Sequence, residues 1–192
     1  MNWPLLLSII ALVISALALY FARLSYGRID VAVGPIHFPI SKGPEYMVLP
    51  LALTNTGARA RAVTGVSLEF LRGSESTNEV RAIAAADVDS LRQDPSNLGL
   101  WASAVVPWVI VPFSSSHGSY VFDLKALRND QYLLDDINAI WEGTLPFRVI
   151  VTAVPSLPQQ RRRYRSSTWR GMGEQEWEAS PGVAVIDVTN TA

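Results

Sequence analysis

The first apolar segment of the chain runs from Trp3 to Ala22 and contains no charged residue. A helix of about twenty residues rises about 30 Å, which matches the hydrocarbon thickness of a bilayer. Pro4 falls in the first turn, where its missing N–H costs nothing, and Trp3 and Tyr20 stand where aromatic belts form. The pattern predicts a transmembrane helix over about residues 4–22.

A cleaved signal peptide is the alternative interpretation of this segment. Ala16-Leu17-Ala18 loosely resembles a cleavage site, but Met1 and Asn2, which precede the apolar run, supply no Lys or Arg. We therefore expect the helix to be retained. The predicted organisation is an anchor with its juxtamembrane segment over residues 1–28 and one domain over residues 29–192.

Small residues form one face of the predicted helix. Their spacings alternate between three and four, and they are Ser8, Ala11, Ser15, Ala18 and Ala22. Helices in lipid associate by close packing of small residues and by hydroxyl hydrogen bonds, because the hydrophobic effect no longer drives them together. The spacing predicts a helix-packing face that docks against another transmembrane helix.

The basic residues near the helix ends indicate its orientation. None precedes the helix, whereas Arg23, Arg28 and Lys42 follow it. The positive-inside rule therefore predicts an N-terminus outside and a domain in the cytoplasm. We expect a single-pass protein of the bacterial inner (cytoplasmic) membrane.

Beyond Gly27 the dominant period of the apolar positions changes to two, which is typical of half-buried strands. The strands that we expect lie at about residues 29–33, 47–54, 66–70, 107–113, 120–124, 147–152 and 182–188. Short strands without regularly alternating helices favour an antiparallel β-sandwich.

Two segments between the strands have the spacing of helices. The first contains a capping box, Ser76 with Glu79, ahead of Val80, Ile83, Ala84 and Leu91. The second contains an apolar stripe made of Leu133, Leu134, Ile137 and Trp141. We expect one helix in each segment, inserted into a mainly β domain as a packing element.

The stretch from Leu51 to Phe70 reads LALTNTGARARAVTGVSLEF. Asn55 and Gly57 tolerate positive φ, so they predict a tight turn between two strands. This stretch resembles the strand, Asn-x-Gly turn and returning strand of bacterial immunoglobulin-like sandwich domains. The whole layout is similar to uncharacterised bacterial single-pass membrane proteins with such a domain. The resemblance implies a binding or scaffolding role and no catalytic residue; many of these relatives are exported, in conflict with the charge count.

The composition of the 192-residue chain excludes several classes of function and of metal site. Its formal net charge of -1 argues against a general nucleic-acid binder, and the absence of cysteine excludes thiolate catalysis and cysteine-ligated metals. His37 and His117 have no carboxylate companions at ligand spacing, and neither a Gly-x-Ser-x-Gly elbow nor a phosphate loop occurs. We expect no catalytic residue, metal or cofactor and no nucleic-acid partner.

One concentrated basic segment remains, and it contains Arg161, Arg162, Arg163, Arg165, Trp169 and Arg170. Arginines interleaved with aromatic residues can contact anionic head groups or a protein partner. Glu174, Glu176 and Glu178 follow a Gly-rich turn, and a hairpin there would place them opposite the arginines. A hairpin that compensates its own charge is the interpretation that we prefer.

These patterns together predict a non-enzymatic accessory or scaffolding subunit of a larger membrane complex, of respiratory or photosynthetic type. Its partners would be other transmembrane subunits and the lipid bilayer. The alternative is an anchored binding module that recognises an extended peptide or an anionic head group through an edge strand or the basic segment. An enzyme with a site assembled from dispersed residues is a third interpretation.

Overall fold

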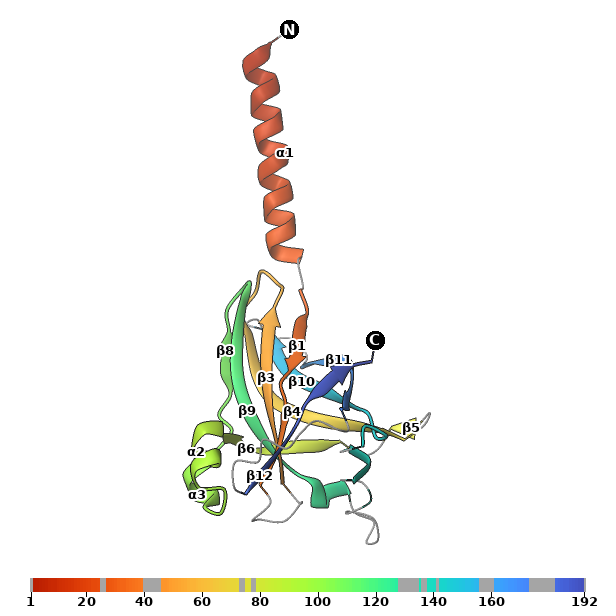
Figure 1. The fold of residues 1–192 in the computed structure, drawn as a ribbon. Helices are drawn as coiled ribbons and strands as arrows, with labels where there is room; N and C mark the ends of the chain where they lie inside the picture. Colours follow the sequence, from red (N-terminus) through yellow and green to blue (C-terminus); the bar gives the residue numbers. More distant parts are fainter. Residues whose placement is uncertain are drawn as a thin grey trace.

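The computed structural model describes residues 2–24, 27–39, 46–72, 75–76, 79–127, 135, 138–140, 142–155, 161–172 and 182–191. Helix α1 (Trp3–Leu24) projects away from the rest of the chain (Figure 1). Its window from Trp3 to Tyr20 has a mean hydropathy of 2.2 and no buried residue, so α1 is long and apolar enough to cross a membrane.

The remainder of the described chain is mainly β. Its strands are β1 (Ile29–Val33), β2 (Ile36–Pro39), β3 (Tyr46–Asn55), β4 (Arg61–Arg72), β5 (Glu75–Ser76), β6 (Val80–Ala86), β7 (Ala102–Ser103), β8 (Trp108–Ile110), β9 (Ser114–Asp123), β10 (Phe147–Pro155), β11 (Arg162–Gly171), β12 (Val183–Ile186) and β13 (Val188–Asn190). Two short helices, α2 (Val88–Gln93) and α3 (Leu98–Trp101), and a 3-10 turn, η2 (Leu124–Leu127), accompany them. All seven predicted strand regions contain strands.

The strands pair antiparallel in the order β12-β2-β3-β9-β6-β4-β10-β11-β13, and β1 pairs with the second half of β3. β12 and β13 stand at the two ends of this path, paired with β2 and β11, and Asp187 alone separates them in the chain. The sheet therefore curls into a nearly barrel-like form (Figure 1). The predicted mainly β, antiparallel architecture is confirmed, and the immunoglobulin-like arrangement stays a prediction.

Alternation along the strands builds the core on the inner face of the curled sheet. In β3 the side chains of Met47, Leu49, Leu51 and Leu53 are all buried there. A smaller apolar cluster lies apart from this core, where α2 and α3 pack against the sheet. It consists of Val48, Leu91, Trp101, Val121 and Val183.

The predicted helix after Ser76 is wrong over its first part, where β6 forms instead. β6 pairs with both β4 and β9, so it supplies the connection between two parts of the sheet. Its Val80 is buried and its Arg81 and Ile83 are exposed, which is strand alternation. Helix α2 begins only after this strand. The apolar stripe of the second predicted helix, Leu133, Leu134, Ile137 and Trp141, lies outside the described residues, although Asp135 and residues 138–140 are helical.

Candidate membrane-proximal interface

The small-residue stripe of helix α1 is exposed. The side chains of Ser8, Ala11, Ser15 and Ala18 are exposed, and the described part of the chain places no residue over them. Ala22 is in the helix, and its side chain lies outside the described residues. The Ser8 hydroxyl donates to the Pro4 carbonyl at 2.9 Å, so it is satisfied within the helix. The packing role of this face stays a prediction.

The chain leaving α1 packs backbone to backbone against the turn between β3 and β4. A Cβ atom added to Gly27 would lie 2.0 Å from the backbone nitrogen of Gly57, so only glycine fits at this contact. Two further bonds hold the same crossing: the Thr56 hydroxyl and the Thr56 amide donate to the Arg28 carbonyl at 2.9 and 3.0 Å. The juxtamembrane segment is therefore clamped to the domain three residues after α1 ends.

Asn55 organises the turn that receives this segment. Its side chain is fully buried, and its Nδ2 group donates to the carbonyls of Arg59, Ile110 and Val111 at 2.7, 3.3 and 3.2 Å. Its Oδ1 atom accepts from the Gly57 amide at 3.0 Å. One amide side chain thus ties the β3–β4 turn to the end of β8. The chain reverses here as predicted, but neither Asn55 nor Gly57 has a positive φ, so the expected reason for the turn is wrong. The bonds of Asn55 hold together the end of the domain nearest α1.

The turn between β8 and β9 carries exposed apolar side chains at this same end. Phe113 is 71% exposed and Val111 is 56% exposed. The Phe113 amide donates to the Gly57 carbonyl at 3.3 Å, which fixes the turn beside the junction with α1. Figure 1 shows the tips of the β3–β4 and β8–β9 connections as the part of the domain nearest the helix.

Arg61 is fully buried next to the junction, which is the contact of Gly27 and Arg28 with the β3–β4 turn. Its Nη2 atom donates to the Gly27 carbonyl at 3.4 Å, whereas its Nε and Nη1 atoms have no partner among the described residues. A buried charge without a paired carboxylate costs several kcal/mol. Arg61 therefore supports the position of the juxtamembrane segment and is a poor source of stability.

The predicted basic segment forms β11, whose neighbours are β10 and β13. Arg163 forms an ion pair with Glu79, and Arg165 Nη2 lies 3.6 Å from the Glu69 carboxylate. Carboxylates from β4 and from the start of β6 therefore compensate these arginines. Glu174, Glu176 and Glu178, the predicted hairpin partners, lie outside the described residues.

The remaining members of the basic segment differ in exposure. The side chains of Arg161, Arg162 and Arg170 are exposed on β11 or next to it. Trp169 is half-buried and packs against the main core. These three arginines are exposed to solvent, whereas the Trp169 ring contributes mainly to the core.

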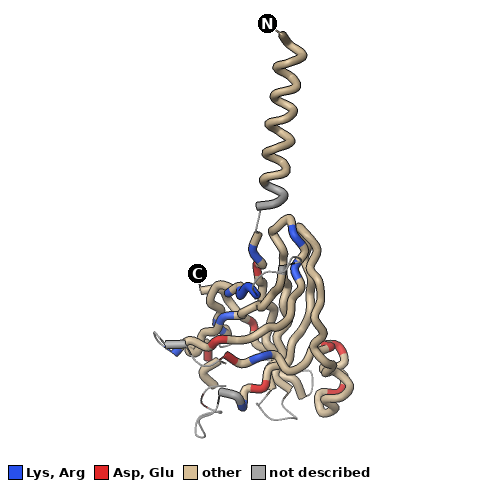
Figure 2. The backbone as a smooth tube through the Cα atoms, turned by 180° about the vertical axis from the view of Figure 1, so that it is seen from behind, with Lys and Arg blue, Asp and Glu red and all other residues tan. Residues whose placement is uncertain are grey.

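Figure 2 shows that the charges of the domain are distributed unevenly. Several basic segments lie near the end that meets α1, acidic segments lie around α2 and α3, and segments of both signs lie between them. Arg28 belongs to the basic end, where its Nε atom lies 2.6 Å from the Asp30 carboxylate. An anionic leaflet attracts basic groups within about a Debye length.

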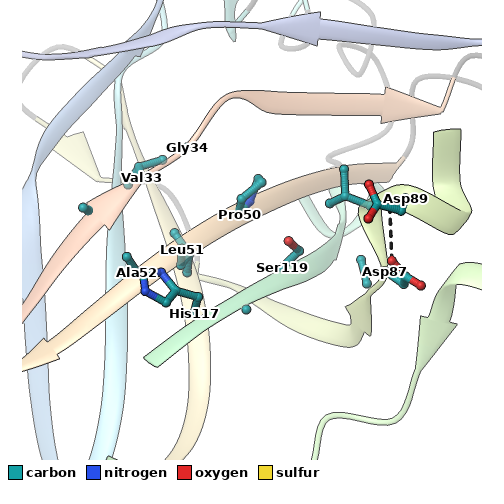
Figure 3. Close-up of a pocket in the computed structure, with 13 residues that line it drawn as sticks. Val33, Gly34, Pro50, Leu51, Ala52, Asp87, Asp89, His117 and Ser119 are labelled. Atoms are coloured by element: carbon teal, nitrogen blue, oxygen red, sulfur yellow. Dashed lines mark hydrogen bonds between the residues drawn. The ribbon is translucent and has the colours of Figure 1, made fainter. Parts of the chain in front are cut away.

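A hollow of about 580 Å³ opens on the outer face of β1, β3 and β9 (Figure 3). His117 and Ala52 lie at one end, and Asp87 and Asp89 lie at the other. Asp87 caps α2 by accepting bonds from the Asp89 amide and from the Ser90 hydroxyl. The Ser90 bonds lower the pKa of the Asp87 carboxyl below its usual value. The Asp87 carboxylate is therefore occupied with the start of α2.

The two histidines lie apart in the structure. His37 is buried in β2, and burial together with the charge of Arg92 lowers its pKa to about 4. His117 lies on the outer face of β9, in the hollow. Within the described residues, no three His, Asp or Glu side chains gather in a way that could hold a metal ion.

No protein-family model, curated protein or solved structure matches the chain. Any functional interpretation therefore rests on the geometry of the described residues. Its main feature is the end of the domain that meets α1, where the chain from the helix, the β3–β4 turn and the β8–β9 turn are bonded together.

Sequence reasoning found the Asn-x-Gly turn but missed its contacts with Gly27 and Phe113. Gly27 follows the apolar segment by only a few residues, which is a weak signal for a close approach. Phe113 follows Pro112 and precedes a run of serines, which indicates an exposed turn tip. Neither signal reveals that Gly27 and Phe113 both contact Gly57.

Proposed function

We propose that the protein is a non-enzymatic, membrane-anchored accessory or scaffolding subunit of a larger membrane complex, of respiratory or photosynthetic type. Its transmembrane helix and its β domain both dock onto other subunits. The observation that carries this proposal is the combination of a wholly exposed apolar helix with a clamped junction. A clamp of this kind transmits the position of the helix to the domain, which is useful for a scaffold.

In this proposal the domain lies in the cytoplasm and folds as an immunoglobulin-like sandwich. Basic groups at the end next to α1 support the orientation, because cytoplasmic flanks of transmembrane helices are enriched in Arg and Lys. A periplasm-dependent reporter enzyme fused after Ala192 should therefore be inactive in cells, and a cytoplasm-dependent reporter at the same position should be active. The reverse pattern would place the domain outside, as in the exported relatives.

The small-residue face of α1 is the docking surface in this proposal. Changing Ala11 and Ser15 together to leucine should leave membrane insertion as favourable as before, since leucine partitions into the bilayer better than serine. It should nevertheless block close backbone approach and remove any hydrogen bond across the helices. We expect the recovery of co-purifying subunits from mild detergent, at equal expression, to fall several-fold.

The matched control changes Leu12 and Ile14, which lie mostly off the stripe, to valine. This variant should retain its partners as the unchanged protein does. Equal recovery from the leucine variant and from this control would remove the helix from the docking surface. A clean monomer of the unchanged protein after gentle purification would contradict the subunit proposal itself.

The second candidate function is an anchored ligand- or peptide-binding module. The hollow on the outer face of β1, β3 and β9 favours it, because small side chains such as Ala32, Pro50 and Ala52 leave room for an added chain. Its openness to solvent favours an extended segment over an enclosed small molecule. Purification would separate the two candidates, since a binding module yields no stoichiometric subunits.

A further inference from the structure

The β8–β9 turn combines an unfavourable backbone conformation with exposed apolar side chains. Phe113 has a φ of 51°, in the left-handed region that bulky side chains avoid. Its ring is also 71% exposed, and Val111 beside it is 56% exposed. Glycine or asparagine would adopt this backbone conformation more easily and would expose no apolar surface. Hydrogen bonds from the Phe113 amide to Gly57 and from Asn55 to the Val111 carbonyl hold the backbone of the turn, whereas both apolar side chains stay mostly exposed.

The position of this turn relative to α1 follows from contacts along the chain. Leu24 is the last residue of α1, and three residues of chain span at most about 11 Å, which limits the distance to Gly27. Gly27 touches Gly57, and the Gly57 carbonyl accepts the Phe113 amide at 3.3 Å. Phe113 is therefore held close to the level at which the helix leaves the bilayer.

The length of α1 sets that level. Its 22 residues rise about 33 Å, slightly more than a hydrocarbon core of about 30 Å. The helix therefore ends within the head-group layer. Arg28 directly follows Gly27 and Arg59 lies two residues after Gly57, so both basic groups would lie near lipid phosphates, as expected for a surface that faces an anionic leaflet.

We propose that the β8–β9 turn, residues 111–113, inserts its apolar side chains into the interfacial layer of the same bilayer that α1 crosses. The occupant of this surface is lipid, at the boundary between head groups and acyl chains. The turn then acts as a second membrane contact beside the helix and fixes the tilt of the domain. This inference rests on the proposed anchor and is independent of the partner subunits.

The absence of cysteine permits single-cysteine labelling of the full chain. An environment-sensitive fluorophore is attached to the single cysteine of the Phe113→Cys variant. The matched control away from the membrane is Leu100→Cys on α3, because Leu100 is 53% exposed in the unchanged protein. Leu12→Cys in α1 reports on the anchor itself. Each protein is placed in vesicles of phosphatidylcholine and phosphatidylglycerol with nitroxide lipids labelled near the head group or near the chain end.

We expect the Phe113 probe to show blue-shifted emission, protection from aqueous iodide, and stronger quenching by the shallow nitroxide than by the deep one. The Leu100 probe should be open to iodide and unaffected by either lipid. A Phe113 probe that behaves like the Leu100 probe, with deep quenching at Leu12, would overturn the inference and leave the anchor intact. Loss of lipid quenching at Leu12 would overturn both. Protection of the Phe113 probe from iodide without lipid quenching would indicate a protein contact and overturn the lipid assignment.

Discussion

Replacing Asn55 with alanine is expected to lower the free energy of unfolding of the domain by about 3 kcal/mol. The change leaves the Gly57 amide without its side-chain acceptor and three backbone carbonyls without their donor at a buried site. Each buried group left unsatisfied costs about 1–3 kcal/mol, although solvent that enters the space recovers part of this. Denaturant unfolding of the full chain in mild detergent, followed by tryptophan fluorescence, measures the change.

The chain offers a control of the same residue type. Asn97 precedes α3, is exposed, and makes no side-chain capping bond, so its replacement with alanine should change stability by less than about 0.5 kcal/mol. Equal stability of the two variants would show that the buried amide contributes little to the junction. The larger loss at Asn55 should be accompanied by easier proteolysis between α1 and β1, because the turn that clamps this segment is loosened.

Acidification is expected to destabilise the domain through His37. Its pKa is about 4 in the folded protein, mainly because of burial and secondly because of Arg92, and about 6.5 in an unfolded chain. Between these values the unfolded state binds a proton that the folded state does not, so stability falls as the pH falls from about 6.5 to about 4. The full shift of the His37 pKa corresponds to about 3 kcal/mol in the free energy of unfolding. This stability is fully present above pH 6.5 and is lost as the pH falls to about 4.

A comparison of variants isolates this histidine from the carboxylates that also titrate in acid. In His37→Leu the additional loss of stability between pH 6.5 and pH 4 should disappear, whereas His117→Gln, on the exposed face of β9, should keep it. The quantity to compare is the slope of the free energy of unfolding against pH, measured by denaturant unfolding. Parallel slopes in the unchanged protein and in His37→Leu would contradict the assignment.

The elements that the sequence alone determined are those in which local pattern and final environment agree. An uninterrupted apolar run of this length predicts one long apolar helix, and α1 is that helix. The alternation in β3, β4, β9 and β10 likewise identified strands, since one face of each lies in the core. The reversal of the chain after β3 was also predictable, although neither Asn55 nor Gly57 adopts the positive φ that was expected.

Tertiary structure alone decided the features that depend on neighbours distant in sequence. Residues 80–86 have helical spacing and still form β6, because pairing with β4 and β9 satisfies their backbone groups. The described ion pairs of Arg163 and Arg165 are made with Glu79 and Glu69, since the pairing order of the sheet brings these strands together. The contact of Gly27 with Gly57, and of Gly57 with Phe113, arises only when three distant segments meet. Local propensity carries no information about such long-range contacts, because they depend on how the whole sheet closes.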